Sequence, residues 1–261
     1  MASFTSFGQV IAVLGQYLGF PGTISRAGTP VIKSRQVLTT TTHNVSFGEA
    51  VVVIPDAVGG TYQSIRDFVA TLANIPALLV AQFAGIAVRN VKTQLTYGNG
   101  VTPGTQQTGY YAPGQMADAL LLGSVVVPIT HGTPAAEGPV YARVAANATL
   151  TATSVGDLEA AADVAATTTG TAASGTTLAV ASPTGIVAGQ LVTSAGYITP
   201  GTYVVSIASS NVLLSQAVIQ AMSTTAVTFT STVALPDVVF TTGVLDANGM
   251  AEITILRRRQ A

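Results

Sequence analysis

The chain has 261 residues, of which 48% are hydrophobic and 8% are charged, and its formal net charge is -1. This hydrophobic content argues against a disordered chain, and the balanced charge gives no field that would collect nucleic acid or an acidic membrane surface. Cysteine is absent, which excludes disulfides, thiolate metal sites and a cysteine nucleophile. No stretch reaches the roughly 18 apolar residues of a membrane-spanning helix. We therefore expect a folded protein that binds neither nucleic acid nor membrane.

The first 30 residues intersperse aromatic side chains with glycine. Four of these side chains are Phe4, Phe7, Tyr17 and Phe20. They follow neither a helical nor a strand period, which predicts an extended arm. Such an arm either lies as a strap across its own domain or reaches a neighbouring subunit, where aromatic side chains often anchor an interface. The four aromatics are therefore candidate contacts with another subunit or with a larger assembly.

One amphipathic helix is predicted over residues 64–74. Apolar side chains recur there at helical spacing, and Ser64 with Asp67 fits a capping box. Pro76 follows and ends the helix. We expect this helix to cover one face or end of a sheet.

The other apolar runs are short and favour strands. They lie at residues 30–38, 45–54, 83–91, 119–127 and 140–144. In the last of these, Val140, Ala142 and Val144 fall on one face while Tyr141 and Arg143 fall on the other, which is the period-2 pattern of a half-buried strand.

The end of the chain predicts two antiparallel strands joined by a turn. Asp246-Ala247-Asn248-Gly249 is a hairpin signal, because Asn-Gly readily adopts the positive φ values of tight turns. After it, Ala251, Ile253 and Ile255 alternate with more polar residues.

A segment of different composition lies between Asp163 and Asp237, where no Asp, Glu, Lys, Arg or His occurs. Its β-branched runs are separated by Gly, Pro, Ser and Asn, which favours short strands. A disordered low-complexity linker is the alternative, but the regular apolar runs argue against it. We predict an inserted small β domain over residues 167–232, within a body formed by residues 31–166 and 233–261.

No catalytic, metal or cofactor motif is recognised in the sequence. His43 and His131 have no His, Asp or Glu at ligand spacing, so a zinc site or serine triad would need distant residues. Phosphate-binding loops, nucleophile elbows and dinucleotide fingerprints are missing. We expect no catalytic residues, no metal and no cofactor.

The basic cluster at the end of the chain consists of Arg257, Arg258 and Arg259. It is either a solvated tail or an electrostatic latch for an acidic partner surface. Three exposed cations without stacking aromatics would bind DNA only weakly and non-specifically.

Three parts of the chain resemble the capsid cement (decoration) proteins of tailed bacteriophages. The first is FAGIAVRNV at residues 83–91, and the second is the stretch 110–144, with Tyr-Ala-Pro-Gly-Gln followed by Gly-Thr-Pro-Ala-Ala-Glu-Gly-Pro-Val-Tyr-Ala-Arg-Val. The third is the end of the chain, from 242, with Thr-Gly-x-x-Asp-x-Asn-Gly-x-Ala-Glu-x-Thr. The segment 167–232 is similar to small β units of phage structural proteins.

The resemblance implies an all-β fold, a sandwich or jelly-roll-like barrel body with one short helix and an inserted small β domain. It implies a non-enzymatic virion protein on the outer capsid surface, with the major capsid protein and further copies of itself, as a dimer or trimer, for partners. The alternative is a phage surface protein that binds a host or receptor through the inserted domain.

Overall fold

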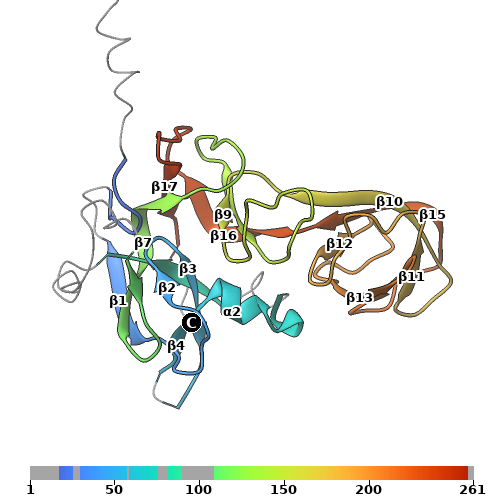
Figure 1. The fold of residues 1–261 in the computed structure, drawn as a ribbon, viewed down its shortest axis with the longest axis horizontal. Helices are drawn as coiled ribbons and strands as arrows, with labels where there is room; N and C mark the ends of the chain where they lie inside the picture. Colours follow the sequence, from blue (N-terminus) through green and yellow to red (C-terminus); the bar gives the residue numbers. More distant parts are fainter. Residues whose placement is uncertain (1–17, 26–29, 58, 76–81, 90–108, 258–261) are drawn as a thin grey trace, which may run out of the picture.

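The structure is a computed structural model, and it describes residues 18–25, 30–57, 59–75, 82–89 and 109–257. Most of the described chain is β-structure (Figure 1). A nine-stranded sheet, here called the body sheet, has the order β4-β3-β5-β7-β17-β16-β8-β9, with β1 also paired to β7. These strands are β1 (Val31–Gln36), β3 (Ala50–Ile54), β4 (Thr61–Ser64), β5 (Phe83–Ala87), β7 (Met116–Pro128), β8 (Pro139–Arg143), β9 (Leu158–Glu159), β16 (Thr232–Phe240) and β17 (Met250–Ile255).

The body sheet curves over on itself. Val52 of β3, near one end of the strand order, and Val140 of β8, near the other end, belong to the same hydrophobic core. The two ends of the strand order also meet, because Arg66, just after β4, donates through Nε to the carbonyl of Val155, just before β9, at 3.2 Å. The predicted all-β, sandwich-like body is therefore confirmed. A separate pair of short strands, β2 (Val45–Ser46) and β6 (Tyr110–Tyr111), lies beside it.

The longest strand, β7, changes its inward face half-way along. Leu120 and Val125 both face the main body core, although they are separated by an odd number of residues. In a regular strand such residues point to opposite faces. The alternation is broken at Gly123, whose φ of 119° lies in the region that favours glycine. Before this break β7 pairs with β1 and β5, and after it β7 pairs with β17.

The predicted helix is present but shorter than expected. The α-helix α2 spans Ile65–Val69, and a 3₁₀ turn, η1, spans Leu72–Asn74. The Asn74 side-chain amide donates to the carbonyl of Phe68 at 3.0 Å, the group to which a continuing helix would direct the Leu72 N–H. Ser64 caps the helix as expected, with its hydroxyl accepting from the Arg66 N–H at 3.1 Å.

The expected antiparallel strands at the end of the chain are confirmed, but a longer loop joins them. β16 pairs with β17 through Val238–Phe240, and residues 241–249 connect the two strands. The turn signal closes this loop at the start of β17, where Gly249 has φ 74° and donates to the Asp246 carbonyl at 3.0 Å. The Asp246 carboxylate accepts from the Asn248 and Met250 N–H groups at 2.8 and 2.9 Å.

The segment without charged residues forms a second, six-stranded antiparallel sheet. Its order is β12-β15-β10-β11-β14-β13. The strands are β10 (Val164–Ala172), β11 (Thr177–Val180), β12 (Leu191–Thr193), β13 (Val204–Ala208), β14 (Asn211–Leu214) and β15 (Met222–Thr230). They start and end within a few residues of the predicted segment 167–232, and whether this segment folds as an independent domain stays a prediction.

The two edge strands of this sheet are bonded to one another. The Val192 N–H donates to the Thr202 carbonyl and the Val204 N–H to the Gln190 carbonyl, each at 2.9 Å. The sheet thereby closes into a small barrel, which we call the barrel (Figure 1). Its interior is filled by a hydrophobic core separate from that of the body, including Leu178 and Phe229. Closure leaves this sheet without an open edge to pair with another chain.

Candidate capsid-contact surfaces and the junction between body and barrel

The described part of the N-terminal arm, residues 18–25, lies along the body. Gly22 donates to the Val126 carbonyl at 2.9 Å, and Ser25 donates to the Ser124 carbonyl at 3.2 Å, so this part pairs with the second half of β7. The Leu18 N–H donates to the Asp246 carboxylate at 3.0 Å, which links the arm to the loop before β17. Residues 18–25 therefore form a strap on their own domain.

Among the predicted aromatic contacts, Phe20 is 43% exposed. The Arg89 guanidinium lies 5.0 Å from the centre of its ring, within cation–π distance. Phe4, Phe7 and Tyr17 lie outside the described residues. The role of these four aromatics in binding another subunit stays a prediction.

The predicted basic latch is described only at its first residue. Arg257 is exposed and lies two residues after the end of β17. Arg258 and Arg259 lie outside the described residues. The sequence-based alternatives, a solvated tail or a latch, both stay open.

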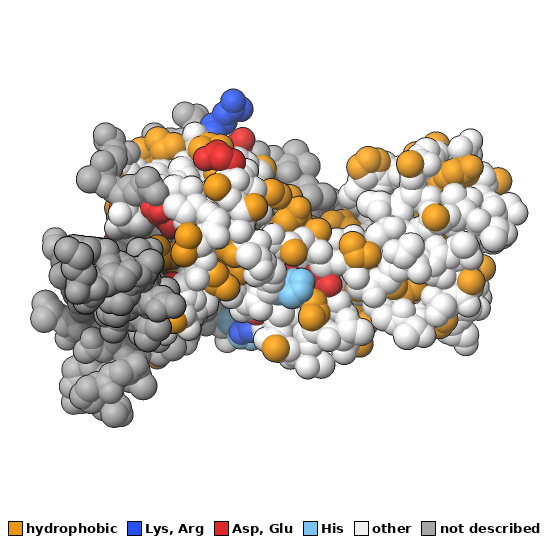
Figure 2. All heavy atoms as spheres, turned by 90° about the horizontal axis from the view of Figure 1, so that it is seen from above, with side chains coloured by type: hydrophobic (Ala, Val, Ile, Leu, Met, Phe, Trp, Pro, Cys, Tyr) orange, Lys and Arg blue, Asp and Glu red, His pale blue; other side chains and the backbone are white. Residues whose placement is uncertain are grey.

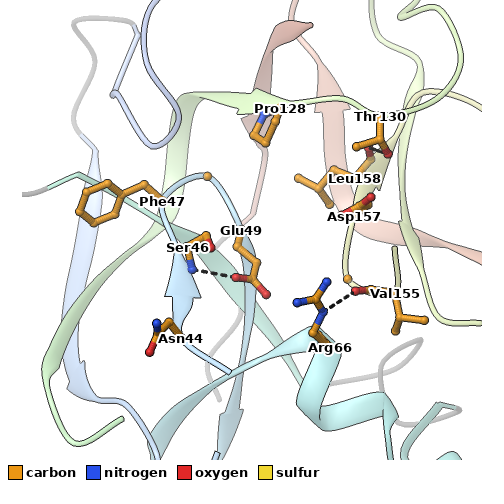
Figure 3. Close-up of a pocket in the computed structure, with 12 residues that line it drawn as sticks. Asn44, Ser46, Phe47, Glu49, Arg66, Pro128, Thr130, Val155, Asp157 and Leu158 are labelled. Atoms are coloured by element: carbon orange, nitrogen blue, oxygen red, sulfur yellow. Dashed lines mark hydrogen bonds between the residues drawn. The ribbon is translucent and has the colours of Figure 1, made fainter. Parts of the chain in front are cut away.

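A pocket of about 310 Å³ lies where the turn before β3, the start of α2 and residues 155–158 meet (Figure 3). In Figure 3 the side chains of Glu49 and Arg66 point toward one another inside it. Burial raises the pKa of the Glu49 carboxyl, although hydrogen bonds from the Ser64 hydroxyl and the Ser46 N–H oppose this effect. Both carboxylate oxygens are thus held by the protein itself, and Arg66 Nε donates to the Val155 carbonyl at 3.2 Å. These bonds tie three segments of the body together.

Each histidine is paired with one carboxylate. His43 Nδ1 lies 2.6 Å from Asp67 Oδ1, and the Thr42 hydroxyl donates to the same oxygen at 2.7 Å. Burial alone would raise the pKa of Asp67, but these hydrogen bonds outweigh it and lower the pKa. The expected capping-box role of Asp67 is wrong in this respect, because its carboxylate binds residues 42 and 43. Within the described ranges, no group of three His, Asp or Glu side chains is placed to hold a metal ion.

A buried ionic cluster that the sequence did not predict lies at the junction between body and barrel. Arg143 was expected on the open face of a half-buried strand, yet its side chain is 0% exposed. The alternation along β8 is as predicted, but carboxylates cover the second face. Arg143 Nε lies 2.5 Å from Glu159 Oε1, and its Nη1 lies 2.7 Å from Asp163 Oδ2.

Further polar groups surround this cluster. Asn147 Nδ2 donates to both carboxylate oxygens of Asp163, at 2.7 and 2.9 Å. His131 Nδ1 lies 3.3 Å from Glu159 Oε2. Burial raises the pKa of Glu159, against the opposing effect of the Arg143 guanidinium. In the sequence, the four polar residues of this cluster lie within 21 residues of one another. Their spacing gives no indication that they are buried.

The comparisons with known proteins give one family. A model of the XM1 gp53 minor capsid protein family matches residues 8–190 of the chain. The chain belongs to this family. A solved structure, the capsid of Myoviridae phage XM1, overlaps 77% of this chain and 89% of its own chain at 16% sequence identity, with a TM-score of 0.34. That score is too low to define a common fold. No curated protein matches the chain.

As a member of the XM1 gp53 minor capsid protein family, the protein is a structural component of a virion. It is not an enzyme, in agreement with the sequence analysis. The match to the family covers Phe20, Arg143 and both carboxylates of the buried cluster, while Arg257 lies beyond it. In the described part of this family member, no helix is long and apolar enough to cross a membrane.

Proposed function

We propose that this minor capsid protein cements the shell by binding the outer capsid surface across neighbouring subunits of the major capsid protein. The observation that carries the proposal is its two-lobed, elongated form within a capsid-protein family. Body and barrel lie side by side along the longest axis of the molecule (Figure 1). Each lobe has its own hydrophobic core. A molecule of this form offers two separate faces for two neighbouring subunits.

The energetic principle is selective binding. A protein that binds the assembled shell but not free subunits shifts the assembly equilibrium toward the shell by mass action. Stable interfaces of this kind bury about 1,200–2,000 Å² and need complementary surface more than charge. The barrel contributes no charged residue to its surface, which in Figure 2 shows only hydrophobic and uncharged side chains. Attachment through such a surface should depend little on salt concentration.

The experiment compares capsids with and without the protein. Purified shells that lack it are incubated with the purified chain, and the temperature at which the shells come apart is measured together with the bound copy number. We expect binding to intact shells, none to free major capsid protein, and a higher disruption temperature. Equal binding to free subunits and shells would refute the cementing role.

We also propose that the protein acts as a homo-oligomer, a dimer or trimer, because subunits that occupy capsid symmetry positions are present in symmetric sets. Sedimentation at micromolar concentration and the number of copies at each capsid position test this. A monomer in both measurements would contradict it.

A second function is host or receptor binding through the barrel. The closed, uncharged barrel at one end of the molecule favours it, because such a lobe can present loops away from the body. Adsorption of particles that carry the protein without its barrel separates the two functions. Lost adsorption with unchanged shell stability would favour host binding.

A further inference from the structure

We infer that Arg143 is a positioning residue that holds the barrel at one fixed angle to the body. This positioning operates in the free protein and does not depend on which capsid surface the protein binds. The chain passes from the body into the barrel just before β10 and returns to the body just after β15. We call these two passages the entry crossing and the return crossing. A connection of this kind alone would leave a hinge.

Both crossings converge on the buried arginine. Asp163, which pairs with Arg143 Nη1 at 2.7 Å, is the last residue before β10. On the return crossing, the Thr232 hydroxyl accepts from the Asp163 N–H at 2.8 Å, and the Ser231 N–H donates to the Asp163 carbonyl at 2.9 Å. The guanidinium, fixed on β8 of the body, therefore binds the entry crossing at a residue whose backbone is itself bonded to the return crossing.

A second contact joins the loop before β12 to the return crossing and to the body. Gln190, in the loop before β12 of the barrel, is 0% exposed. Its amide Nε2 donates to the Ser231 hydroxyl at 3.2 Å and to the Ala146 carbonyl of the body at 3.4 Å. The Ser231 hydroxyl donates to the same carbonyl at 3.1 Å. This contact resists rotation of the barrel about the two crossing strands.

A third contact is apolar. Gly189 lies so close to the body that an added Cβ would meet Leu72 at 3.2 Å and Ile75 and Ala145 at 3.5 Å. Leu191 packs against the main body core. The crossings and residues 189–191 thus hold the barrel to the body at two separate places, so a bend at the crossings must break the contacts of residues 189–191.

The ionic cluster makes the fixed angle obligatory. Tilting the barrel would draw Asp163 away from Arg143 and leave buried charges without partners, which is among the most unfavourable changes that a folded protein can undergo. A neutral contact could adjust by small steps, whereas separating the buried charges of Arg143 and Asp163 is costly.

The test measures the angle directly. The chain has no cysteine, so Thr40→Cys in the body and Ser210→Cys in the β13–β14 turn, both exposed positions, carry a unique pair of spin labels. We expect a single narrow distance distribution in the otherwise unchanged full-length protein. Arg143→Met should broaden or shift it, while Arg257→Met, the same change at an exposed site, should leave it unchanged.

A variant that removes all three charges is included because Arg143→Met alone leaves two buried carboxylates without their partner and could prevent folding. Arg143→Met combined with Glu159→Gln and Asp163→Asn leaves no unpaired buried ion, so the lobes should fold while the distribution still broadens. A broad distribution in the unchanged protein, or an unchanged narrow one in either folded variant, would overturn the inference. A purely stabilising role would lower the melting temperature without broadening the distribution.

Discussion

Replacing Leu178 by alanine tests whether the barrel unfolds as a unit of its own. Leu178 is 0% exposed at the centre of the barrel core, and its Cδ1 would lie 2.7 Å from a Cβ added at Gly170. The surrounding backbone is closed by hydrogen bonds between β12 and β13 and has little freedom to collapse into the space left by the side chain. We therefore expect a cost in the upper part of the usual range for buried Leu→Ala, about 3–5 kcal/mol.

The expected readout is selective. In a unit of about 60–100 residues, each kcal/mol shifts the melting temperature by roughly 4–8 °C, so the barrel transition should fall by at least ~12 °C. Leu120→Ala is the matched control, since Leu120 is also 0% exposed but lies in the body core. Calorimetry should show two transitions, of which Leu178→Ala lowers one and Leu120→Ala the other. A single transition that both variants lower equally would refute the independent barrel and, with it, the domain bounds proposed from composition.

Three further predictions follow from the body. Gly85→Ala should destabilise the body by about 2 kcal/mol or more, because an added Cβ would lie 2.0 Å from the Leu120 carbonyl oxygen; urea unfolding checks it, and an unchanged midpoint would contradict it. The pKa of Glu49 is raised in the folded state above its ordinary value of 4.5, so ionising it opposes folding. The stability of the wild type relative to Glu49→Gln should therefore fall as the pH rises through and above 4.5, and parallel pH profiles would refute this. Removing residues 1–17, which keeps the strap at 18–25, should weaken shell attachment while leaving the melting temperature unchanged; equal losses would show that the removed segment serves only its own domain.

Much of the local structure was available from the sequence because it depends on neighbouring residues. Alternation along β8 placed Val140 and Ala142 in the core, and the Asn248-Gly249 turn placed the start of β17. The composition change after Asp163 marked the second sheet to within a few residues. Each of these signals depends on the strand period, on backbone φ preferences or on the mean polarity of a segment, all of which can be read without knowing the fold.

The tertiary structure decided which partners reach one another across the chain. Helix α2 ends early because the Asn74 side chain takes the Phe68 carbonyl. The six-stranded sheet closes because the chain on either side of Tyr203 bonds back to residues 190–192. Arg143 is buried because two carboxylates reach it, Glu159 from β9 and Asp163 from just before β10. A charged residue on a strand normally faces water, and only the arrangement of distant segments can supply the opposite charges that make its burial favourable.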